Sequence, residues 1–163
     1  MTDQIATLSR ADGYVEARFS RITDQDSARV WAMITESANL PLWLAPGEID
    51  LREGGAAKIN FTDSGVVIDS TVTAFDRGHL LEYSWSAPGQ PQRPVRWQLL
   101  STPQGTIILL TIRTPEGEDA ARAAAGWEAH LDMLEAALAG VPIKFPFERF
   151  KSAREAYREQ LSR

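Results

Sequence analysis

The segment 116–140 constrains the fold of this chain more than any other stretch. Four of its apolar residues recur at intervals of four, three and four positions, the spacing of a stripe on one face of a helix. They are Trp127, Leu131, Leu134 and Leu138. A turn-rich sequence at 114–117 precedes the stripe, and Gly140 follows it, so the pattern predicts a long helix from about residue 118 to 139. Alanines such as Ala124 place only small side chains on one face of this helix, which allows either close packing on a sheet or a cavity beneath the helix.

Most of the preceding chain shows the period-two alternation of β-strands. The predicted strands are 14–22, 48–51, 56–61, 66–75, 79–85, 95–100 and 106–114. Two short helices, 27–35 and 39–44, follow the first strand. Strands joined by short turns form an antiparallel sheet, which needs the long helix across one face to bury it. The sequence therefore predicts an α+β fold in which a curved antiparallel sheet wraps around one helix.

The length of 163 residues is typical of a single domain with a sizeable core. We expect a lead-in at 1–13, the domain proper at 14–140, and an extension of the same domain at 141–163. The 17 basic and 22 acidic residues give a net charge of −5, which argues against nucleic acid as a partner. The sequence has no stretch of roughly 18 apolar residues, so we expect no membrane span and a cytoplasmic protein.

The sequence offers few candidate residues for catalysis or metal binding. The chain has no cysteine and only two histidines, His79 and His130, so we expect no metal site and no cofactor. No Ser-His-Asp order and no close pair of carboxylates stands out, so the sequence names no catalytic residue.

Six short motifs, in order, resemble the activator of heat-shock-protein ATPase homologue family of the START-like (SRPBCC) superfamily. They are ARVW at 28–31, LPLWLAP at 40–46, REGG at 52–55, LEYSW at 81–85, VRWQL at 95–99 and GW at 126–127. The resemblance implies a helix-grip fold with an internal cavity between the sheet and the long helix. It also implies binding of lipids, sterols, polyketides or other apolar molecules, and it supplies no common catalytic residue. The tail after Gly140 is longer than the usual ending of the family.

Ten side chains are the candidates to line that cavity. Five tryptophans are many for a small domain, and each combines a large apolar ring with a polar N–H group, which suits either a core or a pocket wall. The predicted cavity residues are Trp43, Tyr83, Trp85, Trp97, Leu99, Leu110, Ala124, Trp127, His130 and Leu131. His130 lies at the edge of the apolar stripe, where a structural hydrogen bond is the more common role and a general base the alternative.

The extension 141–163 carries an amphipathic pattern of its own, with Phe147, Phe150, Tyr157 and Leu161 on roughly one helical face. Such a stripe must be covered. It predicts either docking on the chain's own domain or a homodimer contact, and the sequence does not separate the two.

Three functional hypotheses follow. The first is a non-catalytic binding module for a small apolar molecule. The second is a co-chaperone-like interaction module, which the family name suggests, although nothing else in the sequence supports a chaperone partner. The third is an enzyme of the cyclase or dehydratase type, in which His130 or Tyr83 moves a proton.

Overall fold

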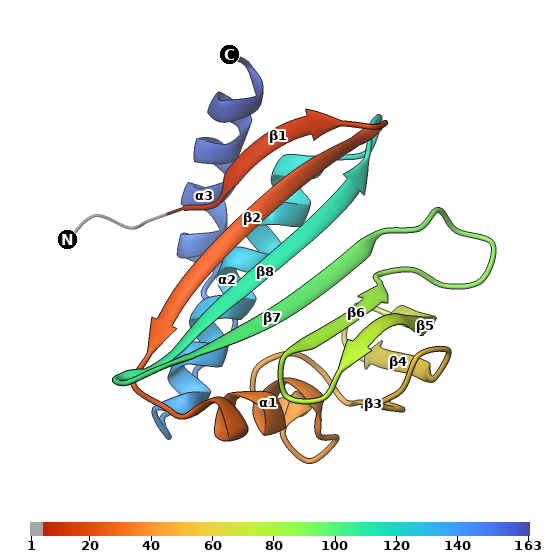
Figure 1. The fold of residues 1–163 in the computed structure, drawn as a ribbon. Coiled ribbons are helices and arrows are strands. Elements are labelled where there is room, and N and C mark those ends of the chain that lie inside the picture. The colour runs from red at the N-terminus through yellow and green to blue at the C-terminus, as the bar shows by residue number, and fades with distance from the viewer. Residues whose placement is uncertain (1–4) are drawn as a thin grey trace.

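The computed structural model describes residues 5–163 and shows one antiparallel sheet covered on one face by helices (Figure 1). The eight strands follow the spatial order β1-β2-β8-β7-β6-β5-β4-β3, and every neighbouring pair is antiparallel. The strands are β1 (Thr7–Ala11), β2 (Tyr14–Thr23), β3 (Gly47–Ile49), β4 (Ala56–Phe61), β5 (Val66–Asp76), β6 (Leu80–Ser84), β7 (Pro94–Thr102) and β8 (Gly105–Pro115). The helices are α1 (Ser27–Thr35), the 3₁₀ turn η1 (Leu40–Leu42), α2 (Ala120–Leu138) and α3 (Phe147–Leu161).

The predicted long helix is α2, and the fold class is confirmed. Asp119 caps the helix, because its carboxylate accepts a hydrogen bond of 3.0 Å from the backbone N–H of Arg122. Leu131 and Leu134 on the predicted stripe are fully buried, and Trp127 and Leu138 nearly so. Within residues 5–163, no helix combines the length and hydrophobicity that crossing a membrane requires.

The predicted strand alternation also holds on the inner face of the sheet. Alternate residues of β6, β7 and β8 are buried under α2, while the residues between them are partly exposed. The inward rows are Leu81 and Tyr83, then Val95, Trp97 and Leu99, then Ile108, Leu110 and Ile112. Arg96 and Arg113 lie on the outer face, where they pair with Glu82 and Glu16 at 3.0 Å.

The structure differs from the sequence analysis in two details. The expected lead-in 1–13 contains a strand that was not predicted, because β1 pairs with β2 along its length; residues 1–4 lie outside the described part of the chain. The signal that sequence reasoning missed is Asp12-Gly13: both residues have positive φ, and Asp-Gly is a preferred turn of a two-residue hairpin. The second helix, expected at 39–44, is only a 3₁₀ turn. The chain then leaves helical geometry at Trp43, whose indole N–H donates to the carbonyl of Met33 at 2.8 Å.

The extension docks on its own domain. Helix α3 packs beside α2 and reaches β1 (Figure 1), and Tyr157 and Ala153 on it are fully buried. Phe150 and Leu161 are half-buried, whereas Phe147 remains 66% exposed at the start of the helix. Most of the predicted stripe is therefore covered within the chain.

Candidate ligand-binding site

Four tryptophan rings from four separate segments meet between α2 and the sheet. Trp97 of β7 contacts Trp43 at a ring-centroid distance of 5.6 Å and Trp127 of α2 at 6.0 Å. Trp85, which follows β6, contacts Trp127 at 4.8 Å. All three contacts are close to edge-to-face, the arrangement that aromatic quadrupoles favour. The cluster thus runs from fully buried Trp43 to half-buried Trp85.

The aliphatic members of the predicted set surround this cluster. Leu110 of β8 lies opposite Trp97 in the register of the sheet, and Leu99 follows Trp97 on the same face of β7. Ala124 and Leu131 of α2 are fully buried in the same core. Eight of the ten predicted residues therefore belong to the hydrophobic core, and the remaining two, Trp85 and His130, contact it through Trp127; their role in binding a ligand stays a prediction.

Two buried polar atoms in this neighbourhood have no hydrogen-bond partner among the described residues: the hydroxyl oxygen of Tyr83 and Nε1 of Trp97. Burial raises the pKa of the Tyr83 phenol well above its usual value, and a hydrogen-bonding interaction with the Trp97 side chain, weaker than a normal hydrogen bond, lowers it only in part, so the hydroxyl is neutral. An unpartnered buried polar group costs about 1–3 kcal/mol. These two atoms are consequently the least satisfied part of the core.

His130 is held in one tautomer at the outer end of the cluster. Its Nδ1 lies 2.9 Å from the carbonyl oxygen of Trp43, which can only accept, so the proton sits on Nδ1. The ring lies among Phe61, Trp127 and Phe145, at centroid distances of 5.9, 6.1 and 5.4 Å. Burial lowers the pKa of His130, and the hydrogen bond to Trp43 offsets this only in part, so the imidazole is neutral at pH 7.

Sequence reasoning missed Phe61 and Phe145 as neighbours of this site. Phe61 is the last residue of β4, and it also contacts Trp85 at 5.9 Å. Phe145 belongs to the irregular segment between α2 and α3, where no local pattern reveals which ring it will meet. Its position between two prolines, Pro142 and Pro146, indicates only that the segment is not a helix.

Two hollows in the described part of the chain lie elsewhere. One, of about 610 Å³, is an open surface hollow near the start of α2, between Arg10, Glu116 and Leu161. The other, of about 110 Å³, lies between β1, β2 and Glu128 of α2. None of the ten predicted residues lines either hollow. Under α2, the aromatic rings of the cluster pack against one another.

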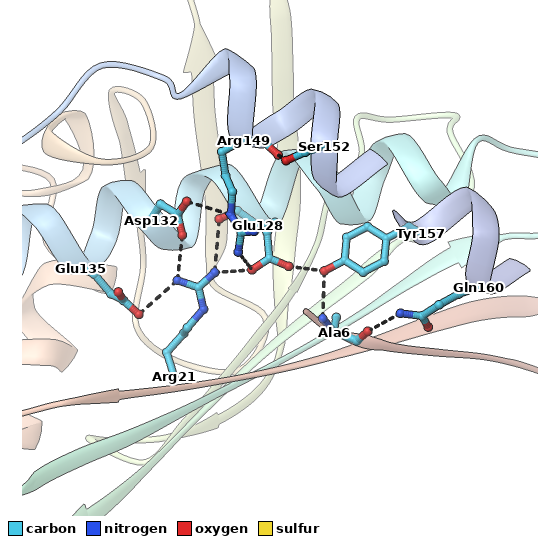
Figure 2. Close-up of polar contacts among 9 residues, drawn as sticks. All are labelled: Ala6, Arg21, Glu128, Asp132, Glu135, Arg149, Ser152, Tyr157 and Gln160. Carbon is cyan, nitrogen blue, oxygen red and sulfur yellow. Dashed lines mark hydrogen bonds and ion pairs between the residues drawn. The ribbon is translucent and has the colours of Figure 1, made fainter. Parts of the chain in front are cut away.

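A second polar cluster, also missed from the sequence, lies on another face of α2 (Figure 2). Glu128, whose side chain is fully buried, pairs with Arg21 of β2 and with Arg149 of α3, and it accepts a hydrogen bond from Tyr157 of α3. Arg21 also pairs with Asp132 at 2.9 Å and Glu135 at 3.0 Å. The spacing of Glu128, Asp132 and Glu135 on one helical face is the signal that could have revealed this cluster.

The charges of this cluster compensate one another. Burial acts to lower the pKa of Arg21, but the carboxylates of Glu128, Glu135 and Asp132 outweigh it and raise that pKa. Burial and the negative charge of Glu128 together raise the pKa of Tyr157, whose hydroxyl also accepts the backbone N–H of Ala6 at 2.9 Å. The cluster therefore connects α3 to α2, to β2 and to Ala6, the residue before β1. We assign it a structural role.

The described residues offer no group of three or more histidine or acidic side chains that could hold a metal ion. The polar side-chain groups at the aromatic cluster are those of Tyr83, Trp97 and His130.

This architecture, a curved antiparallel sheet with a long helix across it, defines a helix-grip domain of the START-like class. A family model described as "Activator of Hsp90 ATPase homolog 1-like protein" matches residues 24–139. The chain belongs to this family. None of the curated proteins matches the sequence.

Solved structures share the fold over nearly the whole chain. CalU16 from Micromonospora echinospora is 21% identical, with a TM-score of 0.78 over 96% of this chain and 98% of its own. A conserved protein of unknown function from Enterococcus faecalis is 19% identical, with a TM-score of 0.79 over 96% of this chain and 90% of its own. A protein from Bordetella parapertussis is 24% identical, with a TM-score of 0.73 over 92% and 87% of the two chains. At these identities the likeness concerns the fold alone.

Proposed function

We propose that this protein is a non-catalytic cytoplasmic domain that binds a small, mostly apolar molecule between α2 and the strands β6, β7 and β8. The observation that carries the proposal is the pair of unpartnered buried atoms, the Tyr83 hydroxyl and Trp97 Nε1. Buried polar groups in folded proteins almost always have a hydrogen-bond partner. A ligand oxygen beside these two atoms would supply the missing partner.

The surroundings of the pair suit an apolar ligand. Trp43, Trp97 and Trp127 offer aromatic edges and faces, and small-molecule sites are mostly lined by such side chains with a few polar groups that fix orientation. Because these rings pack against one another, binding of a ligand among them requires at least one ring to move. Trp85 is the least buried of the four tryptophans in the cluster and is the ring best placed to do so.

Binding can be tested with prodan, a neutral naphthalene dye that carries one carbonyl group. We expect the wild-type protein to bind it with a negative change in heat capacity, measured by calorimetry, and with quenching of tryptophan fluorescence. Native mass spectrometry of the freshly purified protein should show a co-purified small molecule. A protein that binds no prodan and carries no such molecule contradicts the proposal and favours the co-chaperone-like alternative.

Two matched variants locate the site. Trp97→Phe keeps an aromatic ring and removes the N–H donor, so it should weaken prodan binding about two- to tenfold, the value of one net hydrogen bond. Trp31→Phe is the control, because Trp31 packs against Phe75 at 6.1 Å and forms none of the ring contacts of the cluster. We expect Trp31→Phe to leave prodan binding unchanged. Equal effects of the two variants would place the dye elsewhere.

A further inference from the structure

His130 offers one hydrogen-bonding atom that the fold does not use. The Trp43 carbonyl fixes the proton on Nδ1, and Trp43 is itself fully buried and anchored by its N–H to Met33 at 2.8 Å. Nε2 therefore carries a lone pair. Among the described residues it has no hydrogen-bond or ion-pair partner.

The environment of the imidazole is apolar. Phe61, Trp127 and Phe145 surround the ring, and none of the ten predicted cavity residues carries a formal charge at pH 7. These ten side chains therefore offer no charge to compensate a charged ligand group, whose transfer from water without a partner is costly. The walls favour a neutral, flat aromatic molecule that packs against ring edges and faces.

We propose that His130 is a specificity-determining residue of the ligand site, whose Nε2 accepts a hydrogen bond from a hydroxyl or N–H group on a neutral aromatic ligand. This inference rests on the proposed binding function and adds the class of molecule. The polar groups of Trp97 and His130 have opposite hydrogen-bonding roles. Buried Trp97 Nε1 can only donate and would meet a ligand acceptor, whereas Nε2 of half-buried His130 can only accept and would meet a ligand donor.

Two probe molecules that differ in a hydroxyl proton test the contribution of a hydrogen-bond donor on the ligand. 2-Naphthol carries a hydroxyl, and 2-methoxynaphthalene has the same rings with the proton replaced by a methyl group. At pH 7.5, calorimetry on the wild-type protein should give 2-naphthol about two- to tenfold higher affinity, the value of one net hydrogen bond. His130→Phe should bring this ratio close to one by weakening 2-naphthol alone. Asn39→Ala is the control for the general effect of a substitution, because the Asn39 side chain donates to the Ala32 carbonyl at 3.1 Å and is not part of the aromatic cluster.

Because His130→Phe also removes the hydrogen bond to Trp43, a second variant and a direct measurement support the test. His130→Gln keeps both a donor and an acceptor and should retain part of the preference for 2-naphthol. In ¹⁵N spectra of the wild type, the Nε2 resonance should be that of an unprotonated nitrogen and should move upfield with 2-naphthol but not with its methyl ether.

The outcomes are distinguishable. The role of His130 is overturned if the wild type binds the two probes equally, or if the chemical shift of Nε2 does not change on addition of 2-naphthol. Either result leaves the proposed function standing. Binding of neither probe, together with the absence of prodan binding, overturns the proposed function and this inference with it.

Discussion

Replacing the buried carboxylate of Glu128 tests the reasoning about α3 most directly. Glu128→Gln keeps the size of the side chain and removes the charge that Arg21, Arg149 and the Tyr157 hydroxyl share. Breaking a buried ion pair by removing one partner costs about 3–5 kcal/mol when the other charge is left alone. Here the guanidinium groups keep other partners, since Arg21 still pairs with Asp132 and Glu135.

The expected change in the free energy of unfolding follows from the interactions that Glu128→Gln removes. Arg149 also retains Asp132, at 3.2 Å, so no guanidinium becomes unpaired, and the loss should lie at the lower end of that range. The hydrogen bond from the Tyr157 hydroxyl to a charged acceptor contributes about 1.5–3 kcal/mol. We therefore expect Glu128→Gln to lower the free energy of unfolding by about 3 kcal/mol. For a domain of this size that is a large fraction of the total.

The assay is urea denaturation of the full chain, with stability taken from the midpoint at constant m-value. Tyr157→Phe alone should cost about 2 kcal/mol, and the double variant should cost less than the sum, because the two residues share one hydrogen bond. Glu148→Gln is the matched control: its pair with Lys151 is exposed and should contribute less than about 0.5 kcal/mol. A loss below about 1 kcal/mol for Glu128→Gln, or strict additivity with Tyr157→Phe, would refute the reasoning.

Three further predictions concern the aromatic core. Tyr83→Phe should raise the free energy of unfolding by up to about 1 kcal/mol, because it removes a buried hydroxyl without a partner; a decrease like that of Tyr157→Phe would contradict this. Trp127→Ala should cost about 3–5 kcal/mol in the same urea assay, because Trp127 is only 5% exposed, and a loss below about 1 kcal/mol would mean that the ring borders open space. Burial lowers the pKa of His130 below its ordinary value of 6.5, so the unfolded chain binds the proton more readily and stability should fall as the pH drops below 6.5. His130→Phe should reduce this loss of stability at low pH, and an unchanged pH profile would argue against a role of His130 in the loss.

Much of the site could be predicted because its residues follow local periodicity. Tyr83 and Trp97 alternate with partly exposed neighbours along their strands, and Trp127 and Leu131 lie one helical turn apart, so each had to face the core once the sheet and α2 packed together. The contact between His130 and the Trp43 carbonyl joins residues 87 positions apart and depends on the irregular chain after η1. No repeat in the sequence encodes that contact.

The sequence by itself determined the α+β class, the long helix and the inward rows of the sheet, because periods of two and 3.6 residues are properties of neighbouring residues. Only the tertiary structure decided where the extension docks and what holds it. The Arg21–Glu128 pair spans 107 positions and the bond from Ala6 to Tyr157 spans 151, so their formation depends on how β1, β2, α2 and α3 meet in space. The tertiary structure likewise decided that Tyr83 and Trp97 are left without partners, because hydrogen bonding in a core depends on the position and direction of every neighbouring group.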